Sequence, residues 1–309
     1  MTISCIVPNY RHERFLRERL DSILGQTRLP DEVLLLDDAS TDGSQAILEE
    51  YADRGGDHWR CVFNEENSGS AFAQWNKGVG LASGDLIWMA ESDDVAEATL
   101  LETLVSAFDG SKDRVLAVAN SVVIDENGTE LERVDRWYRW LDEERWGAGF
   151  DSPGIDVARG DLAIQSVFPN ASAVLFRKTA FELIGGASTE YPLVSDWLSW
   201  NRMARCGSVR SFPEILNRFR RHEATERAAN QGDGKDLIQY HQIWTLFQKE
   251  LDLPEATRRQ IEALSHRLLV EQGGLQSMRL SSRWNLVREF LPFRPSARHW
   301  SRLLPALIS

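Results

Sequence analysis

Residues 86–94 read Leu-Ile-Trp-Met-Ala-Glu-Ser-Asp-Asp, an apolar run followed at once by three carboxylates. The apolar part predicts a buried strand, so Glu91, Asp93 and Asp94 would emerge together at its carboxyl end. Acids packed this closely repel one another unless a cation lies between them, and hard divalent cations take carboxylate oxygens. Because open α/β sheets bind ligands beyond the carboxyl ends of their strands, this cluster predicts a metal site that holds a phosphorylated ligand.

Short apolar runs alternate with segments of helical periodicity through the first 110 residues. This alternation predicts a Rossmann-like α/β fold, with a mostly parallel central sheet and helices on both faces. The predicted strands are residues 3–7, 33–36, 60–63 and 86–90, and the predicted helices are residues 11–24, 45–51 and 71–81.

The pattern changes after residue 110. Asn127-Gly128 predicts a hairpin turn between two apolar runs, and residues 135–160, acidic and rich in Trp, predict an irregular insertion. From residue 235 onward the chain is predicted to be helical, with prolines as breaks. The other predicted strands are residues 115–124, 129–134, 172–176, 209–212 and 215–220, and the other predicted helices are residues 181–184 and 197–206.

Composition narrows the class of protein. A length of 309 residues allows one large domain with an appendage, and a net charge of -12 argues against nucleic acid as a partner. The three cysteines are far apart and lack metal-ligand spacing, which favours a reducing compartment. The first residues carry no basic leader, and no apolar run approaches the ~20 residues of a membrane span. We therefore expect a cytoplasmic protein.

Six short motifs follow one another in a recognisable order. They are Ile6-Val7-Pro8-Asn9-Tyr10, then residues 20–27, Leu36-Asp37-Asp38-Ala39-Ser40-Thr41-Asp42-Gly43-Ser44, Asn67-Ser68-Gly69-Ser70, Asn76-Lys77-Gly78 and Glu91-Ser92-Asp93-Asp94. Together they resemble the family 2 glycosyltransferases, which have a GT-A fold.

The similarity is dense over residues 1–110 and looser to about residue 225. It implies a GT-A domain over residues 1–225, with a nucleotide-binding half at 1–110 and an acceptor half at 111–225. Residues 226–309 would form a C-terminal helical extension.

The resemblance implies a reaction as well as a fold. The donor would be a nucleotide sugar, a UDP- or dTDP-sugar in preference to a GDP-sugar, bound with Mg²⁺ or Mn²⁺. A hexosyl or deoxyhexosyl group would pass, with inversion, to a hydroxyl of a glycan or lipid-linked acceptor in surface polysaccharide synthesis. Two alternatives stay open: a sugar nucleotidyltransferase, which would need a Gly-rich basic loop near the first strand, and a non-catalytic sugar-binding protein on the same fold.

The resemblance also implies where the nucleotide binds. Asp38 would accept a hydrogen bond from the base, while Pro8, Asn9 and Tyr10 would line the base pocket. Lys77 would replace a donor-binding arginine that the family often carries just before this position.

Further matches concern the metal and the chemistry. Asp93 would bind the metal, and Glu91, with Ser92, would lie near the ribose or sugar, at a place where the family usually has Asp. His222 would be a second metal ligand and Arg221 would bind the diphosphate. By the same resemblance, Asp196 would be the catalytic base that deprotonates the acceptor. The expected site thus consists of this base, the metal ligands Asp93 and His222, and the donor-binding residues Pro8, Asn9, Tyr10, Asp38, Lys77, Glu91, Ser92 and Arg221.

Each of these residues also has a simpler structural explanation. Asp38 and Asp196 could cap helices, and Asp93 with Asp94 could cap a helix beginning near Glu97. His222 could be an ordinary surface residue. The cluster of Trp137, Trp140 and Trp146 could be core, an interface or a platform for an acceptor sugar.

Residues 274–309 form a basic, aromatic tail with six arginines and one glutamate. Its composition suits an interfacial helix on an anionic membrane, which would place the protein at the inner face of the cell membrane. The alternative is a helical appendage that packs on the acidic remainder of the chain, and a homodimer is also left open.

Overall fold

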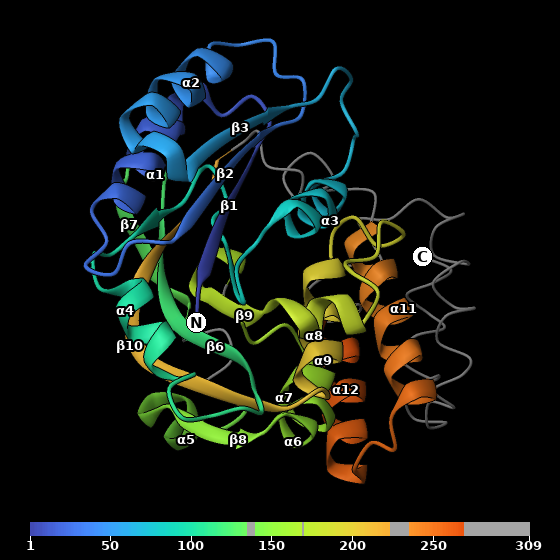
Figure 1. Ribbon diagram of the computed structural model, residues 1–309. Coiled ribbons are helices and arrows are strands. Elements are labelled where there is room, and N and C mark those ends of the chain that lie inside the picture. Colours follow the sequence, from blue (N-terminus) through green and yellow to red (C-terminus); the bar gives the residue numbers. More distant parts are fainter. Residues whose placement is uncertain (135–139, 169, 223–234, 269–309) are drawn as a thin grey trace. The chain divides into compact units, whose positions relative to one another are not determined.

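The computed structural model describes residues 1–134, 140–168, 170–222 and 235–268 (Figure 1). Contacts group these residues into two units, the first made of Met1–Ile155 with Val167–Arg221 and the second of Asp156–Ser166 with His222 onward. The predicted boundary between residues 225 and 226 lies outside the described residues. Each unit is described separately below.

Four parallel strands form the first half of the sheet, in the spatial order β3-β2-β1-β4. The apolar runs of β1, β2 and β4 are buried on both faces, as expected of parallel strands that helices cover, whereas the edge strand β3 is half-buried or exposed. The strands are β1 (Ile3–Asn9), β2 (Glu32–Asp37), β3 (Trp59–Phe63) and β4 (Leu86–Met89). The predicted doubly wound arrangement of this half is confirmed.

Helices cover both faces of these strands, because successive side chains of a strand alternate between faces. Cys5 and Leu35 belong to the core that also holds the apolar stripes of α1 (Glu13–Leu24) and α2 (Ser44–Gly55). The opposite face packs on α3 (Ala71–Leu81). There Gly78 is required, since an added Cβ would lie 2.5 Å from a methyl group of Ile6.

The second half of the sheet is mixed. Strand β9 (Val174–Arg177) is antiparallel to both β4 and β6 (Arg114–Ile124), and β10 (Ser208–Arg220) is parallel to β6. Short strands complete the ten-stranded sheet: β5 (Val95–Ala96) and β8 (Phe150–Pro153) on β10, and β7 (Glu130–Arg133) on β6. The predicted hairpin around Gly128 is confirmed, with φ of +85° at that glycine.

Two predictions in this half need correction. The two short strands predicted at 209–212 and 215–220 are one strand, β10, whose register shifts between Ser211 and Ile215. The segment predicted as irregular contains α5 (Glu143–Ala148) and β8. Its order comes from Trp146, which is 1% exposed and packs edge-on against Phe150. Residues 135–139, including Trp137, lie outside the described residues.

Three further helices complete the first unit: α4 (Leu100–Ser106), α8 (Lys178–Leu183) and α9 (Ser195–Ala204). Single 3-10 turns occur at η1 (Gly56–His58) and η3 (Ala171–Ala173).

The second unit is helical. It contains most of α6 (Gly154–Arg159), with α7 (Asp161–Ile164), α11 (Lys235–Glu250) and α12 (Glu255–His266). The indole of Trp244 donates to the Ile164 carbonyl at 2.8 Å, and buried His241 lies 3.0 Å from the Ser265 hydroxyl. Among the described helices, none has the length and apolarity to cross a membrane. The basic tail lies outside the described residues.

Candidate functional site

The carboxyl ends of β1, β2 and β4 meet at one edge of the sheet, because β1 pairs in parallel with both neighbours: Asn9 is opposite Asp37, and Ile6 is opposite Met89. The loops that leave this edge hold two non-glycine residues with left-handed backbones, Arg11 and Ala39, each with φ of +58°. Such a conformation costs on the order of 1–2 kcal/mol, so the surroundings must enforce it. The Ser40 hydroxyl does so for the first loop by accepting a hydrogen bond from the Arg11 N–H at 2.8 Å.

The acidic loop continues directly from β4. The Ala90 N–H still donates to β1, at the Ile6 carbonyl, and the Asp94 N–H closes a turn onto the Glu91 carbonyl at 3.3 Å. The next helix, α4, begins only at Leu100. Asp93 and Asp94 therefore do not cap it.

Two buried arginines hold the backbone of this loop. Arg19 donates from Nε to the Glu91 carbonyl at 2.8 Å and from Nη2 to the Ser172 hydroxyl at 2.7 Å. Arg220 donates from Nε to the Asp93 carbonyl at 2.8 Å, while its backbone N–H donates to Asp94 Oδ1 at 2.9 Å. The loop is thus clamped from α1 on one side and from β10 on the other.

Sequence reasoning missed both arginines. Arg19 lies within the apolar stripe of α1, beside Leu16 and Leu20. Its position on that stripe was the feature of the sequence that indicated a buried side chain. Arg220 was passed over in favour of its neighbour Arg221.

Glu91 turns away from Asp93 and toward α3. Its Oε1 accepts a hydrogen bond from the Trp75 indole at 2.8 Å, and that indole lies 5.7 Å from the ring of Trp200 on α9. Burial, with the negative charge of Asp93 second, raises the pKa of the Glu91 carboxyl to about 8. This carboxyl therefore keeps its proton to a higher pH than an exposed glutamate does.

Asp94 points into the protein. Its Oδ2 accepts from the Asn170 side-chain amide at 2.6 Å, and Asn170 in turn accepts from the Ser121 hydroxyl at 3.1 Å. Burial and the charge of Asp93 raise the pKa of Asp94 to about 7. Asp94 therefore joins the acidic loop to the second half of the sheet.

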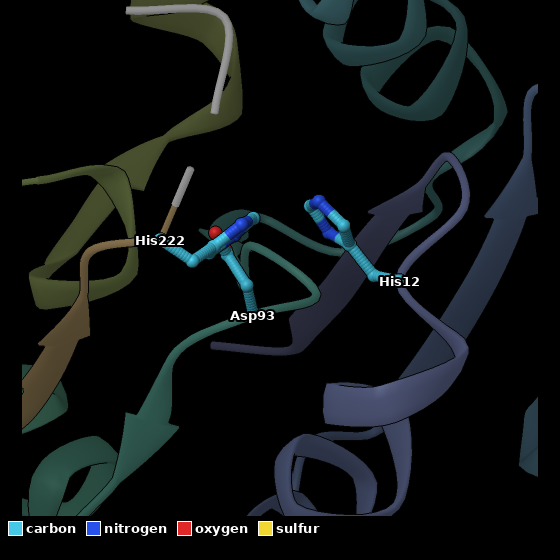
Figure 2. A group of neighbouring side chains, drawn as sticks. All are labelled: His12, Asp93 and His222. Carbon is cyan, nitrogen blue, oxygen red and sulfur yellow. The ribbon is translucent and has the colours of Figure 1, made fainter. Parts of the chain in front are cut away.

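Asp93 is the acid of this loop that meets other metal-binding side chains. Its neighbours are His12 and His222 (Figure 2). Each of the three residues offers one potential ligand atom, these atoms lie within 4.8 Å of one another, and all three residues are half-buried. They come from three segments: the loop before α1, the loop after β4 and the residue that follows Arg221. The predicted metal ligands Asp93 and His222 are thus close together.

His12 was not among the predicted site residues. Its position between the end of β1 and the start of α1 was the signal available in the sequence. His12 Nδ1 lies 2.7 Å from the hydroxyl of Ser92, a predicted donor-binding residue that is 2% exposed.

Asp38 lies in a separate polar cluster at the same edge. Its Oδ1 accepts from the Asn64 and Gln74 side-chain amides and from the Ser68 N–H, and its Oδ2 accepts from the Ser68 hydroxyl at 2.7 Å. Lys77 donates to Asn64. The lysine predicted to bind the donor therefore joins the cluster around Asp38.

The residues predicted to line the base pocket differ in exposure. Pro8 is buried, and the side-chain amide of Asn9 donates to Asp37 Oδ2 at 2.7 Å. Tyr10 is 42% exposed, with the Arg11 guanidinium 5.6 Å from its ring centre. Tyr10 is thus the member of this trio whose ring is open to a ligand.

Asp196 lies on α9 and Arg221 follows β10, so neither belongs to the acidic loop. Asp196 occupies the first turn of α9 and is half-buried. The Arg221 guanidinium pairs with Glu132 Oε1 on β7 at 3.0 Å, with 48% of its side chain exposed. The arginine whose guanidinium reaches the backbone of Asp93 is Arg220.

A Rossmann-like sheet with an acidic loop at its carboxyl edge is the arrangement of the GT-A fold. Solved structures support it: S. aureus TarS 1-349 in complex with UDP-GlcNAc superposes with a TM-score of 0.71 at 18% identity, covering 95% of this chain and 80% of that one. The mannosyltransferase PcManGT from Pyrobaculum calidifontis, in complex with GDP-Man and Mn²⁺, gives 0.62 at 16% identity, covering 99% and 86%. At these sequence identities, the two solved structures show that the fold is similar and nothing further.

The family model of glycosyl transferase family 2 matches residues 4–169, more than half of the chain, and the chain belongs to that family. An uncharacterized glycosyltransferase of Nostoc sp. is 25% identical over 226 residues, covering 72% of this chain and 66% of that protein. GlyG of Streptococcus pneumoniae is 34% identical over 125 residues, 40% of each chain. The glucosyl-dolichyl phosphate glucuronosyltransferase of Haloferax volcanii is 28% identical over 191 residues, 61% of this chain and 56% of that protein. The chain thus spans from two fifths to about two thirds of the length of these relatives.

Proposed function

We propose that this protein is an inverting glycosyltransferase that moves a sugar from a nucleotide diphosphate to an acceptor hydroxyl. The observation that carries the proposal is the meeting of Asp93 with two histidines at the edge of the sheet that also holds Asp38. Family membership and the GT-A fold agree with it.

The donor would span the two polar clusters of this edge. Asp38 Oδ2 accepts a single hydrogen bond from the described residues, so it keeps a lone pair for an N–H of the base. Tyr10 would stack beside that base, and Glu91 would face the ribose or the sugar. A UDP- or dTDP-sugar is the proposed donor, and the UDP-GlcNAc complex of TarS supports this class of ligand.

The diphosphate would lie over Asp93. A carboxylate and an imidazole, from Asp93 and His222, are suitable ligands for Mn²⁺, and a carboxylate also suits Mg²⁺. The bound cation would neutralise the charge that grows on the leaving diphosphate. Arg221 would assist if it left Glu132, an exchange that costs little because both side chains are exposed.

The chemical step needs one displacement. The acceptor oxygen bonds to C1 of the sugar as the bond between C1 and the diphosphate oxygen breaks, and the nucleotide diphosphate leaves. Asp196 would take the proton of the acceptor hydroxyl. Attack from the face opposite the leaving group inverts the configuration at C1, so the protein needs no nucleophile of its own.

The acceptor would be a glycan or lipid-linked, within surface polysaccharide synthesis. The name of the Haloferax volcanii relative, which includes a dolichyl phosphate, supports a lipid-linked acceptor. The basic tail at residues 274–309 would then hold the protein at the inner face of the membrane. Flotation of the full chain with anionic vesicles, but not with neutral ones, is expected, and equal flotation with both would contradict this role.

A thermal-shift screen against nucleoside diphosphates and nucleotide sugars, each with and without Mn²⁺, tests the function. A ligand at about 100 times its Kd stabilises the folded state by about 2.7 kcal/mol. We expect a rise in melting temperature with one base class, and only when Mn²⁺ is present. The absence of any shift across all bases with Mn²⁺ would contradict the proposal.

A further inference from the structure

We propose that His12 is a third protein ligand of the divalent cation, and that Glu91, the first acid of the loop, is not a ligand. This inference rests on the proposed metal-dependent function and defines the ligand set of that site. Ligand atoms on one first-row cation lie about 2.0–2.2 Å from it, and hence no more than about 4.4 Å apart. The spread of the His12, Asp93 and His222 atoms, within 4.8 Å, is close to that limit.

The ring of His12 is held ready for this role. A histidine that binds a metal through one ring nitrogen usually donates the other N–H to an oxygen, which fixes tautomer and orientation. Here the Ser92 hydroxyl is 2.7 Å from Nδ1. In the tautomer with the proton on Nδ1, Nε2 is the ring nitrogen able to bind a metal. Ser92 is buried and adjacent to Asp93, so one short segment would supply both a ligand and the group that orients another.

The backbone of His12 is equally constrained. Its carbonyl accepts from the N–H groups of Phe15 at 2.8 Å and Leu16 at 3.1 Å, which fixes it at the start of α1. Its ring packs edge-on against Phe15, with 6.0 Å between centres. The preceding residue, Arg11, holds the left-handed conformation. Strain of this kind persists where the surroundings fix a functional geometry.

Glu91 is directed elsewhere by three hydrogen bonds. Its carboxylate accepts from the Trp75 indole, its carbonyl from Arg19, and its N–H donates to the Ser172 hydroxyl at 3.1 Å. Among the described residues, the clustered metal-binding groups include Asp93 but neither Glu91 nor Asp94. The longer side chain at position 91 thus reaches α3.

This ligand set has a consequence for the metal. Two imidazoles and one carboxylate suit first-row transition metals such as Mn²⁺, whereas Mg²⁺ prefers an all-oxygen shell with several waters. We therefore expect the protein to bind Mn²⁺ without nucleotide, and Mg²⁺ to displace it only at an excess of at least about tenfold.

The test is a Mn²⁺ titration of the metal-free full chain, without nucleotide, followed by electron paramagnetic resonance. His12→Ala should weaken Mn²⁺ binding by at least about tenfold, and Ser92→Ala by a smaller factor, since it removes only the orienting hydroxyl. Glu91→Gln should leave the affinity unchanged. The control is His58→Ala, because His58 is exposed at the opposite edge of the sheet, just before β3.

A measurement on the unmodified protein makes the test independent of any folding defect in a variant. Electron spin-echo modulation of bound Mn²⁺ should show couplings from two imidazole nitrogens. A single coupled nitrogen would overturn the inference, as would an unchanged affinity in His12→Ala or a loss in Glu91→Gln equal to the loss in His12→Ala.

Donor binding separates this inference from the proposed function. If the wild-type protein binds a nucleotide sugar with Mn²⁺ and His12→Ala binds metal and donor equally well, the inference fails and the function stands. If the wild-type protein binds Mn²⁺ through two imidazoles but binds no nucleotide sugar, the function fails and the ligand set stands.

Discussion

Arg220 is expected to be the residue on which the shape of the acidic loop depends most. Its side chain is 1% exposed and donates to the Asp93 carbonyl at 2.8 Å, the Asp125 carbonyl at 3.0 Å and Glu18 at 2.5 Å. Arg220→Met keeps the length of the side chain and the backbone hydrogen bond to Asp94 but removes every side-chain donor.

The cost follows from the groups left behind. Each carbonyl that loses its donor in a largely buried place costs about 1–2 kcal/mol, because Asp93 and Asp125 retain some contact with water. Glu18 is 55% exposed, so its ion pair adds at most about 1 kcal/mol. We predict a loss of about 2–5 kcal/mol in the free energy of unfolding. Mn²⁺ affinity should fall by about 10- to 100-fold, the usual effect of losing an outer-shell partner of a metal ligand.

Urea unfolding followed by tryptophan fluorescence measures the first quantity, and a Mn²⁺ titration measures the second. The matched control is Arg218→Met on the same strand. Arg218 pairs with Glu97 and Glu130 with 37% of its side chain exposed, so its loss should cost less than about 1 kcal/mol. Equal stability losses for the two variants, or full Mn²⁺ affinity in Arg220→Met, would refute the reasoning.

Three further predictions concern single carboxylates. The pKa of the Glu91 carboxyl rises from 4.5 to about 8 on folding, so between these pH values the folded chain binds more protons than the unfolded chain. The stability of the metal-free protein should therefore fall as pH rises through that window. In urea unfolding, Glu91→Gln should make this fall less steep between about pH 5.5 and 8.5, and an unchanged slope would contradict the prediction. In Asp38→Asn, the new amide N–H would face the hydrogen-bond donors of Ser68 and Gln74, so the free energy of unfolding should fall by about 2–4 kcal/mol in the same assay. A fall of less than about 1 kcal/mol would contradict the role of Asp38 in organising this cluster. Asp196→Asn should lower kcat by about 10²–10⁴-fold at unchanged donor affinity in a transfer assay, and near-normal turnover would remove it as the base.

The nucleotide-binding half could be predicted because its signals are local. Each strand there is a continuous apolar run that ends at a polar turn, and α1 places Leu16, Leu20 and Ile23 on one buried stripe. The carboxyl edge follows from parallel pairing. The sequence alone therefore places Asp93 and Asp38 at one edge of the sheet.

The parts that could not be predicted depend on long-range contacts. Strand β10 shifts register between Ser211 and Ile215 and again before Asn217, and each shift changes which side chains face the core. Local alternation therefore could not show that Arg220, and not Arg221, turns inward. His12 and Asp93 are far apart in sequence and meet only because β1 and β4 are neighbours in the sheet.

The most direct test of the central claim is calorimetry of nucleotide-sugar binding to the wild-type protein and to Asp93→Ala, each with Mn²⁺ and with the metal removed by a chelator. The account predicts that wild-type protein with Mn²⁺ binds the donor. Either removing the metal or replacing Asp93 should weaken binding by about 100-fold, equivalent to about 2.7 kcal/mol. Equal donor affinity in all four measurements would contradict a metal-dependent diphosphate site at Asp93.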